Sequence, residues 1–177
     1  MENVNIIEKW IKSIIVGLNL CPYAKQPFES GKIKINICES EHIQLMFDSV
    51  IKEIEALNTN ADFETTLVAF PIYENTFKEF YSFSMLIEEA LEDANLLKDF
   101  QIVAFHPEFE FEGVDKSERI NLVNRSPYPL IHILKSQSIA NLNLTPSEGE
   151  DISRKNEEIL NNMDNEKFDS LFKPLSK

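Results

Sequence analysis

The chain has 177 residues, enough for one domain that buries a substantial core without disulfides or metals. Hydrophobic residues make up 43 % and aromatic residues 10 %, which excludes an intrinsically disordered chain. With 30 Asp and Glu against 17 Lys and Arg, the net charge is −13, which disfavours nucleic acid and anionic membranes as partners.

The N-terminal residues and the cysteines indicate the compartment. The first ten residues have neither the basic flank nor the unbroken apolar core of a signal peptide. No run approaches the ~20 apolar residues that a membrane span needs. The two cysteines, Cys21 and Cys38, have no spacing typical of a metal or redox motif. We therefore expect a cytoplasmic protein with both thiols reduced.

The first half of the chain alternates between helical and extended patterns. Apolar residues at helical spacing predict a helix over residues ~3–19, and a loop follows over 20–31. Strict alternation predicts a strand over 32–38, with Ile33, Ile35 and Ile37 inward. A second helix is expected over ~41–58, and a short apolar run predicts a buried strand over 66–70.

The pattern continues with a helix over ~76–95, for which Asn75 is the expected N-cap. Residues 100–105 predict a third strand, which ends at His106 and Pro107. Strands that alternate with helices are typical of parallel crossovers. The sequence thus predicts an α/β fold: a small, mostly parallel sheet of three or four strands flanked by helices.

Residues 115–177 are expected to form a mainly helical extension packed on the same single domain, 1–177. Pro129 suits the first turn of a helix that carries Leu130, Ile131, Leu134 and Ile139, with His132 in that turn. A polar loop is predicted over 141–151. Further helices are expected over ~150–163 and ~165–173.

Two residues have side chains suited to catalysis or metal binding. His106 ends a buried strand, and loops that follow parallel strands commonly form sites. Cys21 suits a nucleophile, a redox thiol or a metal ligand, but a helix C-terminus opposes thiolate formation. The alternatives are a structural histidine and a small buried thiol. A simple topology also places Cys21 at the sheet edge opposite His106. Candidate metal ligands are Cys21, His106 and His132, and no cofactor is identified.

The chain uses arginine sparingly: three of its 17 basic residues are Arg119, Arg125 and Arg154. Arg is favoured over Lys where a planar bidentate donor is required. Arg125 lies in the proline-stiffened run Asn124–Pro129, which suits binding of a carboxylate or another anion. The alternative is an arginine that ties this loop to an acidic helix. The accompanying candidate ligand-binding residues are Lys25, Asn124, Ser126, Tyr128 and Arg154.

Five sequence blocks carry a family resemblance: Gly17–Lys25, Thr65–Leu67, Phe105–Pro107, Phe111–Gly113, and Asn124–Pro129 with His132. With Arg154 and Asn156, these blocks resemble a bacterial family catalogued as domain of unknown function 1415. The resemblance implies a small one-domain bacterial protein. It implies no activity, so no catalytic role is carried over, but its blocks contain the candidate residues.

Three functions remain open. The first is an enzyme that acts on a small anionic or carboxylate-bearing substrate through Cys21, His106 and Arg125. The second is a metal- or haem-binding protein that uses Cys21 with His106 or His132. The third is a non-catalytic module that binds a small metabolite through Arg125, Tyr128 and Arg154. A small-molecule ligand is expected in the first and third cases, and the oligomeric state is open.

Overall fold

The computed structural model describes residues 1–60, 62–140 and 146–173. Its centre is a sheet in the order β1-β2-β4-β3, made of β1 (Ile33–Ile37), β2 (Thr65–Ala69), β3 (Phe100–Phe105) and β4 (Leu130–Lys135). β1 and β2 pair in parallel, whereas β4 lies antiparallel between β2 and β3. The predicted α/β class and strand number are confirmed, and β1, β2 and β3 run in one direction. The sheet is mixed because β4 runs against them.

The predicted helix beginning at Pro129 is wrong, because Leu130–Lys135 is the strand β4. Leu130, Ile131 and Ile133 are fully buried, so the strand is covered on both faces. A strand of this kind has a nearly continuous apolar run instead of an alternating one. Such a short run does not distinguish a helix from a strand by its period alone.

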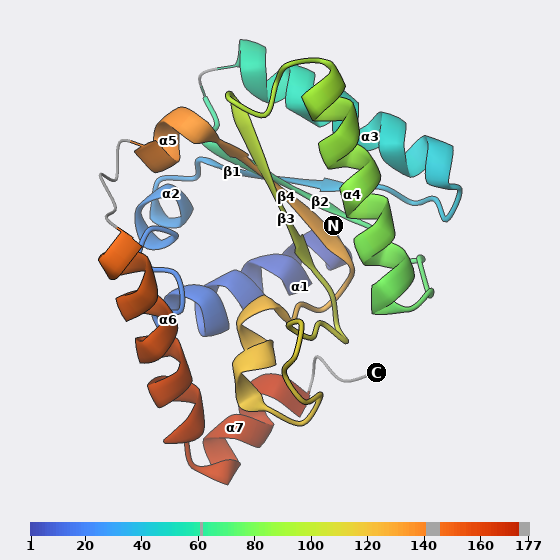
Figure 1. Cartoon of the computed structure of the whole chain (residues 1–177). Helices are drawn as coiled ribbons and strands as arrows, with labels where there is room; N and C mark the ends of the chain where they lie inside the picture. The colour runs from blue at the N-terminus through green and yellow to red at the C-terminus, as the bar shows by residue number, and fades with distance from the viewer. Residues whose placement is uncertain (61, 141–145, 174–177) are drawn as a thin grey trace.

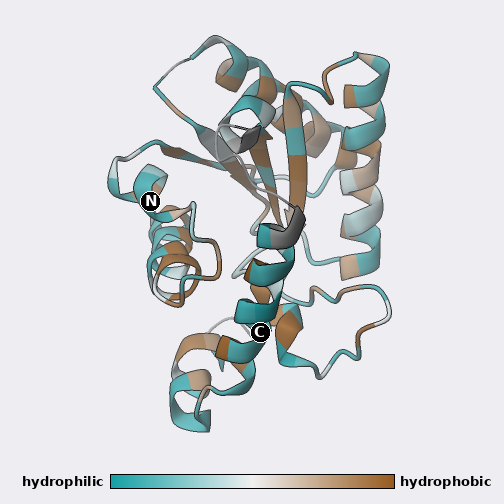
Figure 2. Cartoon of the chain, turned by 60° about the vertical axis from the view of Figure 1, so that its left-hand side comes forward, coloured by the Kyte–Doolittle hydropathy of each residue, from teal (hydrophilic) through white to brown (hydrophobic). Residues whose placement is uncertain are grey.

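Helices cover both faces of the sheet (Figure 1). One face packs against α3 (Ile43–Thr59) and α4 (Phe77–Asp93). The other face packs against α1 (Glu2–Trp10) and the following η1 (Ile11–Val16). Seen from the side, the strands form an apolar layer between helices whose outer surfaces are largely hydrophilic (Figure 2). The two cores are therefore separated by the sheet.

Four further elements complete the face that α1 covers: α2 (Lys25–Glu29), η2 (Arg119–Asn124), α6 (Pro146–Asn161) and α7 (Asn165–Phe172). The short α5 (Ser136–Ala140) directly follows β4. The predicted C-terminal helices are confirmed, although α6 begins inside the predicted loop 141–151, of which residues 141–145 lie outside the described residues. Arg119 joins η2 to the end of α6, where its Nη1 donates to the carbonyls of Leu160 and Met163 at 2.9 and 2.8 Å.

The N-cap of α4 is Thr76, not the predicted Asn75. Thr76 and Glu79 form a reciprocal capping box, in which each side chain accepts a hydrogen bond from the other's backbone amide. Two otherwise unpaired amides at the helix start are thereby satisfied. None of the helices within the described parts of the chain has the length and apolarity needed to span a bilayer.

The first helix changes its winding halfway along. η1 is a π-helix, in which hydrogen bonds span one more residue than in an α-helix, and the Leu20 amide continues this pattern by donating to Ile15 O at 3.0 Å. Glycine is required at position 17, because the backbone of the preceding turn lies so close that a Cβ on Gly17 would be 2.4 Å from Ser13 O. π-Helical turns are frequent at functional sites, so the surface beneath η1 is of interest.

Candidate functional site

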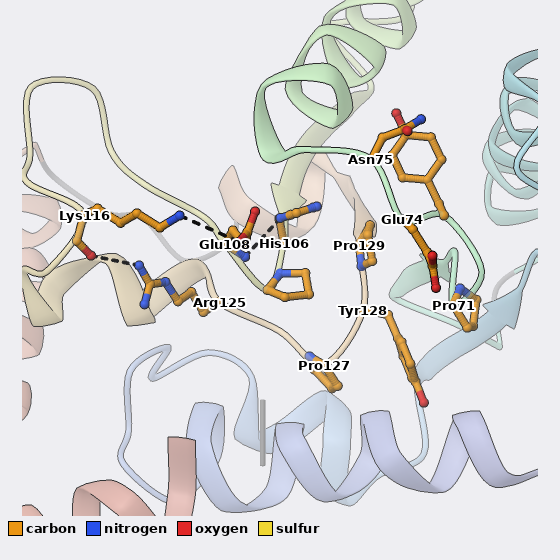
Figure 3. A pocket seen from close by; sticks show the side chains of 12 residues that line it. Pro71, Glu74, Asn75, His106, Glu108, Lys116, Arg125, Pro127, Tyr128 and Pro129 are labelled. Atoms are coloured by element: carbon orange, nitrogen blue, oxygen red, sulfur yellow. Dashed lines mark hydrogen bonds and ion pairs between the residues drawn. The ribbon is translucent and has the colours of Figure 1, made fainter. Parts of the chain in front are cut away.

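Two concave sites contain most of the candidate residues. The first, called the edge pocket, lies where β2 and β3 end and β4 begins, and has a volume of about 460 Å³ (Figure 3). It is lined by Pro71, Tyr73, Glu74, Asn75, His106, Pro107, Glu108, Lys116, Arg125, Pro127, Tyr128 and Pro129. The sheet topology accounts for this convergence, since three chain segments meet at one sheet edge.

The imidazole of His106 is held firmly at the wall of the edge pocket. The residue is 3 % exposed, and its ring packs against Phe77 and Phe80 at 5.7 Å between centroids. Nδ1 accepts a hydrogen bond from the Glu108 amide at 3.0 Å. Burial lowers the pKa of His106, while the Glu108 carboxylate and a hydrogen bond to the Asn75 backbone oppose this shift. Burial therefore favours the neutral ring, and a backbone amide orients it.

Arg125 ties a long loop to the fold. Its Nε donates to Phe109 O at 3.1 Å. Its Nη2 donates to Lys116 O at 3.0 Å, as Figure 3 shows, so two guanidinium nitrogens are bound to backbone carbonyls. Burial lowers the pKa of Arg125, and the carboxylates of Glu110 and Glu108 oppose this effect. Arg125 is therefore held by backbone carbonyls of the loop after β3 and not by an acidic helix, and its Nη1 makes no hydrogen bond to a residue within 1–60, 62–140 or 146–173.

The other predicted ligand-binding residues are dispersed. The Tyr128 hydroxyl points toward α1 and donates to Asn3 Oδ1 at 3.1 Å, although the ring lines the edge pocket. Ser126 is fully buried and donates to Tyr128 O at 2.6 Å. Lys25 and Arg154 lie in exposed helical ion pairs with Glu29 and Asp151, outside both sites.

The second site, called the apolar cavity, lies between η1, the turn after it and the α1-facing side of the sheet. Its volume is about 330 Å³. The lining is formed by Trp10, Ile11, Ile15, Leu20, Cys21, Tyr23, Ala24, Ile33, Leu67, Val103, Phe105, Val123, Asn124, His132 and Leu134. Its polar side chains are few, and Cys21, Asn124 and His132 all belong to the blocks that carry the family resemblance.

His132 projects from β4 into the apolar cavity. Its Nε2 lies 2.6 Å from Thr65 Oγ1, and that hydroxyl also lies 2.6 Å from Ile133 O. Burial lowers the pKa of His132 to about 4, so the ring is neutral at physiological pH. Sequence reasoning treated Thr65 only as part of a resemblance block and did not predict its contact with His132.

Cys21 lies in the turn after η1 and lines the apolar cavity while remaining exposed. Burial of the sulfur raises the pKa of Cys21, and hydrogen bonds from the backbone of Tyr23 and Ala24 only partly oppose this. A raised pKa keeps the group as a thiol at neutral pH. Cys21 therefore shares a site with His132, whereas His106 and Arg125 line the edge pocket.

This separation bears on the metal hypothesis. Within residues 1–60, 62–140 and 146–173, no three His, Cys, Asp or Glu side chains are grouped so that they could hold a metal ion. Cys21 and His132 are the two candidate ligands that share a lining. The carboxylates of Glu108, Glu110 and Glu112 are exposed, while Phe109 between them is buried.

The neutral state of His132 predicts a pH-dependent stability. The folded pKa is about 4 and the unfolded value ~6.5, so between these pH values the unfolded chain binds the extra proton. The free energy of unfolding should therefore fall by about 2 kcal/mol from pH 7 to pH 5 through this group. Urea denaturation of wild type and His132→Gln at both pH values measures the difference.

His42→Gln is the matched control, because it removes an exposed imidazole that does not line the apolar cavity. His106 adds a contribution of the same sign, which both variants retain. The same pH dependence in wild type and His132→Gln would contradict the prediction.

The comparisons with known proteins identify the family. Neither the search of curated proteins nor the search of solved structures finds a match. A family model described as "Protein of unknown function (DUF1415)" matches residues 2–170. This match covers nearly the whole chain and includes every block that carries the resemblance. The chain belongs to the DUF1415 family of proteins of unknown function.

Proposed function

We propose that this protein binds a small, predominantly apolar molecule in the apolar cavity, with His132 and Cys21 among the polar groups of its lining. The observation that carries the proposal is a preformed cavity of about 330 Å³ with a neutral, oriented imidazole in its wall. Ligand sites are typically apolar concavities of ~300–1,000 Å³ with few well-placed polar groups.

A packing defect is a poor account of this space. Protein interiors are close-packed, and an engineered cavity of ~150 Å³ already binds benzene. The apolar cavity is about twice that size. It also lies beneath the π-helix η1, whose Ile11 and Ile15 line it. Because π-helical turns are frequent at functional sites, this winding beside the cavity supports a functional role for it.

Ligand binding in the cavity can be followed by intrinsic fluorescence, because Trp10 is the chain's single tryptophan and lines the cavity. Titration with 1-octanol, which is transparent where tryptophan absorbs, should change Trp10 fluorescence saturably and raise the melting temperature. Val103→Phe, which fills the cavity, should abolish both effects. Leu97→Phe is the control, because Leu97 is an exposed residue that lines neither site.

A chemical block tests the same cavity without a core substitution. Alkylation of exposed Cys21 with N-phenylmaleimide at pH 8.5 should abolish the octanol response, whereas buried Cys38 should stay unlabelled. Cys21→Ser treated in the same way should still bind. No fluorescence change and no thermal stabilisation up to the solubility limit of 1-octanol would refute the proposal.

The edge pocket supports a second candidate, which is the carboxylate-binding function expected from the sequence. His106, Arg125 and Lys116 line this single pocket, and Nη1 of Arg125 makes no hydrogen bond to the described part of the chain, so it can bind a ligand. Two carboxylates, Glu74 and Glu108, line it as well, and Glu108 lies 3.7 Å from the Lys116 ammonium. Thermal stabilisation by a small carboxylate that is lost in Lys116→Met would support this candidate.

A further inference from the structure

The geometry assigns a ligand class to the apolar cavity: an uncharged molecule with an apolar body and one O–H or N–H group, which donates a hydrogen bond to Nδ1 of His132. Thr65 is the positioning residue that sets this preference. The inference rests on the proposed function and goes beyond it by naming the chemistry of the ligand.

The argument starts from the single proton of the Thr65 hydroxyl. Thr65 Oγ1 lies 2.6 Å from Ile133 O, and a carbonyl oxygen can only accept, so the hydroxyl proton points there. The same oxygen lies 2.6 Å from His132 Nε2. Because Thr65 has no second proton to give, Nε2 must carry the hydrogen of this bond. The neutral imidazole is therefore the Nε2–H tautomer.

The other ring nitrogen, Nδ1, then bears a lone pair and is an acceptor. No hydrogen bond reaches it from residues 1–60, 62–140 and 146–173. The His132 residue is half-buried, so its ring is not sealed in the core. Because His132 lines the apolar cavity, a ligand there can reach this acceptor.

An acceptor in an apolar wall selects its ligand in two ways. A hydroxyl or N–H group donates a hydrogen bond to Nδ1. An ether oxygen has no proton to donate, so it forms no hydrogen bond with the Nδ1 lone pair. An ionised carboxylate loses its hydration in a mostly apolar lining and gains no donor from Nδ1 of His132. The strongly acidic chain adds a field that repels anions.

Three matched probes test this ligand class in the intact protein: 1-octanol, its isomer heptyl methyl ether, and octanoate, each followed by Trp10 fluorescence. The alcohol should bind roughly tenfold more tightly than the ether, which is the value of one hydrogen bond. Octanoate should bind more weakly than the alcohol. Equal affinity for alcohol and ether overturns the inference but leaves the proposed function intact, whereas binding of none of them overturns both.

Thr65 provides the second test. Thr65→Val removes the acceptor for Nε2–H at nearly constant volume and should bring the affinities for alcohol and ether within about twofold, while Thr65→Ser should restore the tenfold preference. A purely structural role would weaken both ligands alike. Should Thr65→Val not fold, ¹⁵N NMR of the wild-type histidines decides, because a proton on Nδ1 of His132 overturns the inference.

Discussion

Replacing Lys34 with Met is expected to lower the free energy of unfolding by about 3 kcal/mol. The Lys34 ammonium lies 2.6 Å from Glu53 Oε2, and the Asn36 amide donates to Oε1 at 3.0 Å. The Glu53 side chain is 7 % exposed, so without Lys34 its charge stays buried beside one amide donor. Breaking a buried ion pair on one side leaves an uncompensated charge, which is the costly case.

The partner substitution should cost less. Glu53→Gln keeps an oxygen for Asn36, and the Lys34 side chain, already 34 % exposed, can turn into water. We expect a loss of about 1 kcal/mol for Glu53→Gln and a near-native stability for the double variant Lys34→Met/Glu53→Met, which buries no charge. Urea denaturation at pH 7 measures all three. Equal losses for the two single variants would contradict this asymmetry.

The first part of the fold, in which helices and strands alternate along the chain up to β3, could be predicted because the sequence patterns of these elements are local. β1 alternates Ile with polar residues, while β2 and β3 are short apolar runs closed by a polar residue or proline. Each such pattern occurs within a few residues and is independent of the rest of the chain. The capping box at Thr76 and Glu79 is equally local, but the N-cap was predicted one residue too early, at Asn75.

The non-local features could not be predicted in this way. β4 inserts between β2 and β3, and only its pairing with both strands shows that Leu130–Lys135 is extended. Because β4 is inserted there, His132 lies on the sheet face beneath η1. Cys21, in the turn that follows η1, lines the same cavity. Sequence reasoning paired Cys21 with His106, although it also noted that a simple topology puts them at opposite edges.

Arginine scarcity was a real signal with a structural cause. Arg119 donates to two carbonyls at the end of α6, and Arg125 donates to two carbonyls of the loop after β3. Both uses require a planar group with several fixed donors, which Lys does not offer. The scarcity of Arg led to a ligand-binding interpretation of Arg125, whereas the acceptors observed for both Arg119 and Arg125 are backbone carbonyls.

The largest effect on stability is expected from Phe80→Ala, which should lower the free energy of unfolding by about 3–5 kcal/mol. Phe80 is fully buried, and its ring lies 5.7–5.9 Å from those of Phe70, Phe83, Tyr73 and His106. It therefore joins α4 to the ends of β2 and β3 and forms part of the wall behind the edge pocket. Urea denaturation measures the loss, and Phe80→Leu, which keeps most of the volume, should lose under half as much.

The adjacent Tyr81 separates this packing effect from an effect on the helix itself. Tyr81 is 50 % exposed on the same turn of α4, so Tyr81→Ala should change the free energy of unfolding by about 0.5 kcal/mol or less. In Phe80→Ala, water gains access to the His106 ring, and the pKa of His106, which burial lowers in the wild type, should rise toward its ordinary value. An NMR titration of His106 tests this. A large loss of stability with an unchanged His106 titration would show that Phe80 supports the core without shielding the edge pocket.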